Sequence, residues 1–344
     1  MGKAAAARKL AAAAAYGGGG VSLLGASLYG VLRLEAEIAR AAIGNAVGDP
    51  PDATGWYGKG RPGPTLKLAL LGDSSAAGYG VGTVQDTPGA QLASGLAEGA
   101  DRRVYARSLA VVGAQSRDLD TQITDALTMG PHVAVILVGA NDVTHRVRPS
   151  ESVRLLEAGV RRLREAGVEV VVGTCPDLGT VDPIVFPLKQ LARAWSRRLA
   201  AAQSIAVVEA GGRTVSLGSV LGVEFAASPK LFFGPDQFHP SAAGYATLAS
   251  VLLPSALAAV GVIPIEDLVP EAYRGEGVMP VATAAVRAAQ TPGTEIDGTE
   301  VGGSERGARG RWVQLRRRRR QPESDTETPT TSADERAGET ADIT

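Results

Sequence analysis

Short, continuous apolar runs recur along the middle of the chain, and segments with helical spacing separate them. The clearest run, HVAVILVG at residues 132–139, contains no Asp, Glu, Lys or Arg. Such a run is typical of a central parallel strand that is buried on both faces of a sheet. Strands that alternate with helices in this way predict an α/β fold, in which helices cover both faces of a parallel sheet.

The apolar pattern predicts five strands and five main helices. The strands are expected at residues 66–71, 104–111, 132–139, 168–174 and 205–208. The helices are expected at residues 91–98, 116–129, 150–166, 184–202 and 241–260. Ser116 is a candidate N-cap for the second of these helices.

Composition excludes several classes of protein and site. Hydrophobic residues make up 44% of the chain and charged residues 21%, as in a globular protein. The net charge of −1 gives no bias towards nucleic acid, so no nucleic-acid partner is expected. The one cysteine, Cys175, excludes an intramolecular disulfide and a multi-cysteine metal site. The predominance of Arg over Lys, with abundant Ala and Gly, is typical of a bacterial, high-GC source.

The N-terminal region, residues 1–48, contains a candidate membrane segment. No charged residue occurs between Leu10 and Leu32, and Lys3, Arg8 and Lys9 precede this run. The run is long enough to cross the roughly 30 Å hydrocarbon core as a helix. Basic residues on its N-terminal side predict a signal anchor with the rest of the chain outside the cytoplasm. A cleaved signal peptide, which would make the protein secreted, and a soluble Ala-rich helix are the alternatives.

Two further segments flank the predicted domain at residues 65–265. Residues 49–64 are rich in Pro and Gly and indicate a linker. Residues 266–344 lose the apolar periodicity and are predicted to be a disordered tail. The basic run Arg316–Arg320 in this tail has two interpretations, a solvated segment or a contact with anionic lipid or an anionic envelope polymer.

Polar residues follow the predicted strands at the points where a parallel sheet binds its ligands. A serine, a histidine, an acid and two potential oxyanion donors all occur there, which is the set of groups that nucleophilic acyl transfer requires. These positions are Asp73-Ser74-Ser75, Gly113, Asn141-Asp142, and Asp236 with His239.

Four of these stretches together resemble the SGNH (GDSL-type) hydrolase family, over roughly residues 65–262. They are Gly72-Asp73-Ser74, Gly113, Gly139-Ala140-Asn141-Asp142 and Asp236-Gln237-Phe238-His239-Pro240, in family order. The sequence departs from the common family pattern at Ser75, where leucine is usual. The resemblance implies a three-layer α/β/α fold with a parallel, flavodoxin-like five-stranded sheet.

The resemblance also implies a role for each site residue and no metal or cofactor. Ser74 would attack an ester carbonyl, His239 would carry the proton, and Asp236 would orient the imidazole. The N–H groups of Ser74 and Gly113 and the amide of Asn141 would bind the oxyanion.

The neighbouring polar residues are expected to be mainly structural. Asp73 could instead belong to a metal or phosphate site, and His145 could contact substrate, although a surface loop position is favoured for it. The remaining expectations are a helix N-terminal position for Ser75, a structural role for His132, a loop-fixing role for Asp142 and a buried free thiol for Cys175.

The leading functional hypothesis is a membrane-anchored, extracytoplasmic serine esterase. Its substrate would be a carboxylic ester of an acyl lipid, of an acetylated glycan or of another envelope component. A cell-envelope O-acyltransferase using the same site and a non-catalytic anchored binding module are the competing hypotheses.

Overall fold

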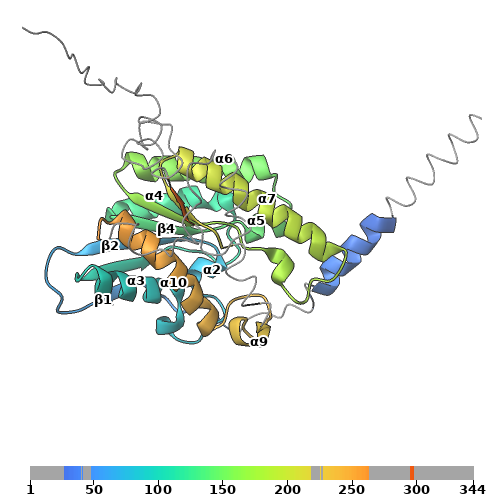
Figure 1. Cartoon of the computed structure of the whole chain (residues 1–344), viewed down its shortest axis with the longest axis horizontal. Coiled ribbons are helices and arrows are strands. Elements are labelled where there is room, and N and C mark those ends of the chain that lie inside the picture. The colour runs from blue at the N-terminus through green and yellow to red at the C-terminus, as the bar shows by residue number, and fades with distance from the viewer. Residues whose placement is uncertain are drawn as a thin grey trace, which may run out of the picture.

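The computed structural model describes residues 27–39, 41, 48–217, 225, 228–262 and 295–297. Most of the predicted membrane segment, most of the predicted tail and the run Arg316–Arg320 lie outside the described residues. Residues 27–39 form a helix that extends from one side of the domain (Figure 1).

The described strands form one sheet, in the order β1-β3-β2-β4-β5-β6-β7. The five central strands are parallel, which confirms the predicted fold class. An antiparallel strand is added at each edge, β1 next to β3 and β7 next to β6. The strands are β1 Gly55–Tyr57, β2 Leu66–Gly72, β3 Val104–Ser108, β4 Val133–Leu137, β5 Glu169–Gly173, β6 Arg213–Val215 and β7 Glu295–Asp297.

Helices cover both faces of the sheet, as Figure 1 shows. Helices α3 and α10 pack on one face, and α4, α6 and α7 pack on the other. Successive residues of β2 face opposite layers, so Leu68 and Leu70 pack with α3 and α10 while Ala69 and Leu71 pack with the other layer. The helices are α2 Ser74–Ala77, α3 Pro88–Gly99, α4 Leu119–Met129, α5 Ala140–Thr144, α6 Pro149–Glu165, α7 Leu188–Glu209, α9 Pro229–Phe232 and α10 Ala242–Ala259.

The predicted strand at residues 205–208 is wrong, because these residues belong to the last turns of α7. Ala206, Val207 and Val208 are buried there, and a short buried apolar run has the same pattern in a helix and in a strand. The fifth parallel strand is instead β6, which follows after Gly211 and Gly212. The predicted helix at 184–202 accordingly begins and ends later, as α7.

The predicted N-cap at Ser116 is also wrong. Residues Ser116–Asp118 form a short 3₁₀ turn, and Gln115 and Asp118 satisfy each other's backbone N–H groups in a capping box before α4 begins. The Ser116 hydroxyl instead donates to Asp142, which lies next to Asn141 in α5.

Both flanking segments contribute an edge strand. Strand β1 lies within residues 49–64, predicted to be a linker, and β7 lies within residues 266–344, predicted to be disordered. The described residues include one helix that is long and apolar enough to cross a membrane, α10. Leu248, Leu252 and Ala256 of this helix are buried against the sheet, so α10 is a core helix.

Candidate active site

The turn after β2 holds Ser74 at the carboxyl edge of the sheet. Gly72 has a φ of +128°, and a Cβ there would lie 1.8 Å from the Leu137 carbonyl oxygen, so only glycine fits. The Asp73 N–H donates to the same carbonyl oxygen at 2.9 Å. The Asp73 carboxylate accepts from the Ser75 N–H at 2.9 Å and thereby caps α2. Ser74 is therefore the first residue of α2, where its N–H has no intrahelical acceptor.

Ser74, His239 and Asp236 form a hydrogen-bonded chain. His239 Nε2 lies 2.9 Å from Ser74 Oγ, and His239 Nδ1 lies 2.6 Å from Asp236 Oδ2. The other oxygen of Asp236 accepts from the backbone N–H groups of Phe238 and His239, at 3.0 Å each. A carboxylate only accepts, so Nδ1 carries the ring proton and Nε2 presents a lone pair to the Ser74 hydroxyl. This is the arrangement of a general base beside an alcohol nucleophile.

The two aspartates near Ser74 have opposite electrostatics. Burial alone would raise the pKa of Asp236, but the hydrogen bonds from the His239 ring and from the two N–H groups lower it below its ordinary value. Burial dominates at Asp73 and raises its pKa to about 6. Asp236 is therefore the aspartate that stays ionised next to the imidazole, whereas Asp73 serves as a helix cap.

Aromatic rings hold the imidazole in place. The ring of His239 meets the rings of Tyr79 and Phe238 edge to face, with centroids 4.8 and 4.9 Å apart. The Tyr245 hydroxyl donates to the Tyr79 carbonyl oxygen at 2.8 Å and ties this turn to α10. The His239 side chain keeps 13% of its surface exposed, so the imidazole remains accessible from outside.

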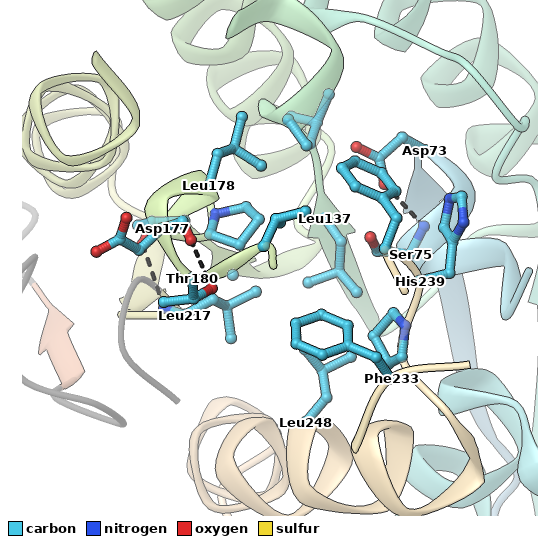
Figure 2. A pocket seen from close by; sticks show the side chains of 18 residues that line it. Asp73, Ser75, Leu137, Asp177, Leu178, Thr180, Leu217, Phe233, His239 and Leu248 are labelled. Atoms are coloured by element: carbon cyan, nitrogen blue, oxygen red, sulfur yellow. Dashed lines mark hydrogen bonds between the residues drawn. The ribbon is translucent and has the colours of Figure 1, made fainter. Parts of the chain in front are cut away.

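An apolar cavity lies beside the imidazole, among the loops after β4, β5 and β6 (Figure 2). Asp73, Ser75 and His239 lie on one side of it, and Leu137 projects into its centre. Its remaining walls are mainly apolar side chains, including Leu178, Leu217, Phe233, Phe238 and Leu248. The cavity can take an apolar group next to Ser74 and His239.

Gly113 lies in the loop after β3 and Asn141 lies in the short helix α5, and both segments approach the same edge of the sheet. The Val111 N–H donates to the Gly72 carbonyl oxygen at 3.0 Å, which ties the turn containing Gly113 to the end of β2. Gly113 has a φ of +85°, and a Cβ added there would meet open space. Glycine is therefore favoured by the backbone conformation and not by a lack of room for a side chain. Asn141 Nδ2 donates one hydrogen to the Ala114 carbonyl oxygen at 3.0 Å and keeps its second hydrogen for another acceptor.

Hydrogen bonds between buried polar groups fix α5, which carries Asn141, to the segment that follows Gly113. The Asp142 carboxylate accepts from the Ser116 N–H at 3.2 Å and from the Ser116 hydroxyl at 2.9 Å. Ser116 Oγ also lies 2.9 Å from Ser152 Oγ in α6. Burial raises the pKa of Asp142. Asp142 thus joins α5 to the segment after Gly113. The sequence did not predict its partners Ser116 and Ser152, because no motif marks them.

A second buried contact that the sequence did not predict supports the end of β2. Gln122 in α4 accepts from the Gly72 N–H at 2.6 Å and donates to the Gly72 carbonyl oxygen at 3.0 Å. The glutamine side chain completes hydrogen bonding at the point where the strand ends and the turn to Ser74 begins.

The other singled-out residues lie in structural positions. His145 is exposed, and its Nδ1 lies 2.9 Å from the Asn141 carbonyl oxygen, at the end of α5. His132 accepts from the Lys67 N–H at 3.1 Å, at the opposite end of the strands. Cys175 is fully buried, and burial raises the pKa of its thiol well above the ordinary value. Among the described residues, no group of three or more His, Cys, Asp or Glu side chains could hold a metal ion.

The chain is similar to known proteins in sequence and to solved structures. The chain is 41% identical over 245 residues to Rv1075c, a GDSL-like esterase of Mycobacterium tuberculosis, covering 68% of this chain and 77% of that protein. Among solved structures, it is similar to LAE5, an alpha/beta hydrolase from the metagenome of Lake Arreo, with 19% identity, a TM-score of 0.45, and 58% and 96% of the two chains covered. It is also similar to Axe2, an acetylxylan esterase of Geobacillus stearothermophilus, with 18% identity, a TM-score of 0.43, and 57% and 94% covered.

The family match spans the whole set of site residues. It begins at residue 70, just before Ser74, and ends at residue 247, just after His239. Together with the identity to an esterase, this match shows that the chain belongs to the GDSL-like lipase/acylhydrolase family and is a carboxylic ester hydrolase.

Proposed function

We propose that the protein cleaves carboxylic esters through an acyl-enzyme on Ser74. The observation that carries this proposal is the hydrogen-bonded chain from Ser74 Oγ through His239 to Asp236, with distances of 2.9 and 2.6 Å. His239 Nε2 takes the hydroxyl proton as Oγ attacks the ester carbonyl, and it then gives that proton to the leaving alcohol. Water then gives a proton to the same nitrogen as it attacks the acyl-enzyme, and His239 returns that proton to Ser74 Oγ as the acid leaves.

The oxyanion is assigned to three donors in the same proposal. They are the N–H groups of Ser74 and Gly113 and the free amide hydrogen of Asn141. Each such donor typically contributes a factor of about 10²–10³ to the rate. The link from Asp142 to Ser116 would keep the second and third donors at a constant separation.

The substrate class and the location belong to the same proposal. The apolar cavity beside His239 supports an acyl group as the part of the ester that enters the site. The uncharged segment Leu10–Leu32 supports a membrane anchor, with the domain outside the cytoplasm. Acyl lipids and acetylated envelope glycans are the esters available there, and Arg316–Arg320 would add a contact to anionic lipid or polymer.

Replacing the two adjacent serines separately tests the nucleophile. Ser74→Ala should abolish hydrolysis of 4-nitrophenyl acetate and labelling by a fluorophosphonate, with an unchanged circular dichroism spectrum. Ser75→Ala is the matched control and should retain both activities, since it keeps the backbone N–H of Ser75 that donates to Asp73 in the cap. Labelling that persists in Ser74→Ala would contradict the assignment of the nucleophile.

The same reagents separate the competing functions. A non-catalytic binding module would not react with the fluorophosphonate at all. An O-acyltransferase would form the acyl-enzyme and then pass the acyl group to an added sugar alcohol faster than to water, which product analysis would reveal.

A further inference from the structure

A second apolar groove lies behind the wall of the cavity beside His239. The helix at residues 27–39 forms one side of this groove and α7 forms the other. Leu178 and Phe238 line both spaces, so these two side chains alone are common to the cavity and the groove. The Phe238 ring is also the one that meets the His239 imidazole edge to face, at 4.9 Å.

Specific contacts hold the 27–39 helix in this position. The Leu188 N–H, at the start of α7, donates to the Glu35 carboxylate at 3.0 Å. No side chain of the local sequence caps α7, so an acid from the far end of the chain supplies the cap and complements the helix dipole. Ala39 is buried in a cluster with Leu178, Val181 and Ile184.

The walls of the groove are apolar, with small residues facing each other. Ala36 and Ala39 lie on the 27–39 helix, and Ala192 lies on α7. Of the described residues that line it, Arg146 is the charged one. Its guanidinium hydrogen-bonds to Tyr29 and lowers the pKa of that phenol, so its charge is directed to a polar partner.

Exposed apolar side chains surround the groove. Phe186 is 76% exposed, a large fraction for an aromatic ring, and it precedes α7 directly. The others in this part of the surface are Leu28, Val31, Leu34 and Ile38 of the 27–39 helix, Val185, and Trp195 of α7. A group of exposed apolar side chains on the elements that form a groove favours a contact with lipid or with a partner.

We infer that this groove binds the long acyl chain of a lipid ester whose carbonyl lies at Ser74. The inference rests on the proposed function and names its substrate class. The chain would pass from the cavity beside His239, past Leu178 and Phe238, into the space between Ala36 and Ala192. Lipid is the occupant we favour, because the first turns of the 27–39 helix belong to the uncharged run Leu10–Leu32 that is predicted to lie in the membrane.

Filling the groove from either wall tests the inference. The readout is kcat/KM for 4-nitrophenyl dodecanoate divided by that for 4-nitrophenyl acetate, measured on the full chain in detergent. Ala192→Phe and Ala36→Phe should each lower this ratio by about tenfold or more, since losing the burial of two methylenes has an effect of that size. Ala194→Phe, also on α7 but on its exposed face, is the matched control and should leave the ratio unchanged.

A binding measurement separates failure of the groove from failure of the proposed chemistry. In Ser74→Ala, a dansyl-labelled undecanoic acid should bind with enhanced fluorescence, and adding Ala192→Phe or Ala36→Phe should weaken this binding about tenfold or more. Binding in Ser74→Ala needs no catalysis, so it supports the groove even if Ser74 proves not to be the nucleophile. A ratio and an affinity within twofold of the parent in both groove variants, or an equal loss in Ala194→Phe, would overturn the inference.

Discussion

Asp236→Asn is the sharpest perturbation of the site, because the structure determines how the new amide must sit. Asp236 Oδ1 accepts two backbone N–H groups, from Phe238 and His239, at 3.0 Å each. An asparagine keeps its oxygen there, since turning its NH₂ group towards two buried donors would leave both unpaired, at about 1–3 kcal/mol each. The NH₂ group therefore faces His239 Nδ1, at the position of the 2.6 Å hydrogen bond.

This geometry forces the imidazole into the wrong tautomer. Nδ1 must accept from the amide, so Nε2 carries the proton and can no longer take one from Ser74. The imidazolium that forms during attack also loses its negative partner. We expect kcat to fall by about 10⁴, equivalent to about 5.5 kcal/mol of transition-state stabilisation.

The assay is hydrolysis of 4-nitrophenyl acetate at pH 7, with the rate of fluorophosphonate labelling followed in parallel. Both should fall together, because both require Nε2 to accept the Ser74 proton. The melting temperature of the variant serves as the control for folding. A loss of less than tenfold in a folded variant would refute this account of how Asp236 acts.

Three further predictions follow from buried contacts around the site. Gly113→Ala should lower kcat and stability together, by about 1–2 kcal/mol for the strained φ of +85°, as measured by ester kinetics and urea unfolding; unchanged values would show that this turn readily changes conformation. Gln122→Leu should lower the free energy of unfolding by about 1–3 kcal/mol, because the Gly72 N–H loses its partner while the Gly72 carbonyl oxygen keeps the hydrogen bond from Val111, and an unchanged free energy of unfolding would argue against that role. Asp73 has its pKa raised to about 6 in the folded protein, so ionising it there is unfavourable; its contribution to stability is present below about pH 4 and is lost as the pH rises through about 6. Asp73→Asn should remove about 3 kcal/mol of this decline when its urea unfolding is compared with that of the parent between pH 4 and 7, and parallel profiles would contradict the assignment.

The sequence predicts the strands, and singles out the candidate site residues, where a short stretch of neighbouring residues carries the whole pattern. The runs at 66–71, 132–139 and 168–174 are mainly apolar, with Lys67 and Glu169 as their charged residues, and such runs have few alternatives to a buried strand. Ser74, Asn141 and His239 could be singled out because each follows a predicted strand or precedes a predicted helix within a short motif.

Contacts and boundaries that depend on segments far apart in the chain could not be predicted from local sequence patterns. The buried end of α7 has the same apolar pattern as a strand, so the predicted fifth strand lies several residues before β6. Gly211 and Gly212 separate the helix from the true strand. Ser116 lies 26 residues from Asp142, and the Glu35 cap lies 153 residues from Leu188. Such contacts form only when distant segments pack together, so a single polar residue in a helix does not predict them.

The chain separation between Ser74 and His239 has a consequence for how the enzyme is made. The hydrogen bond between them spans 165 residues, and nearly the whole domain lies between the two partners. During N-terminal-first synthesis, Ser74 emerges long before His239, its hydrogen-bond partner. Under the proposed mechanism, the nascent chain carries an inert hydroxyl, and ester cleavage begins only when the segment that carries His239 has docked on the sheet.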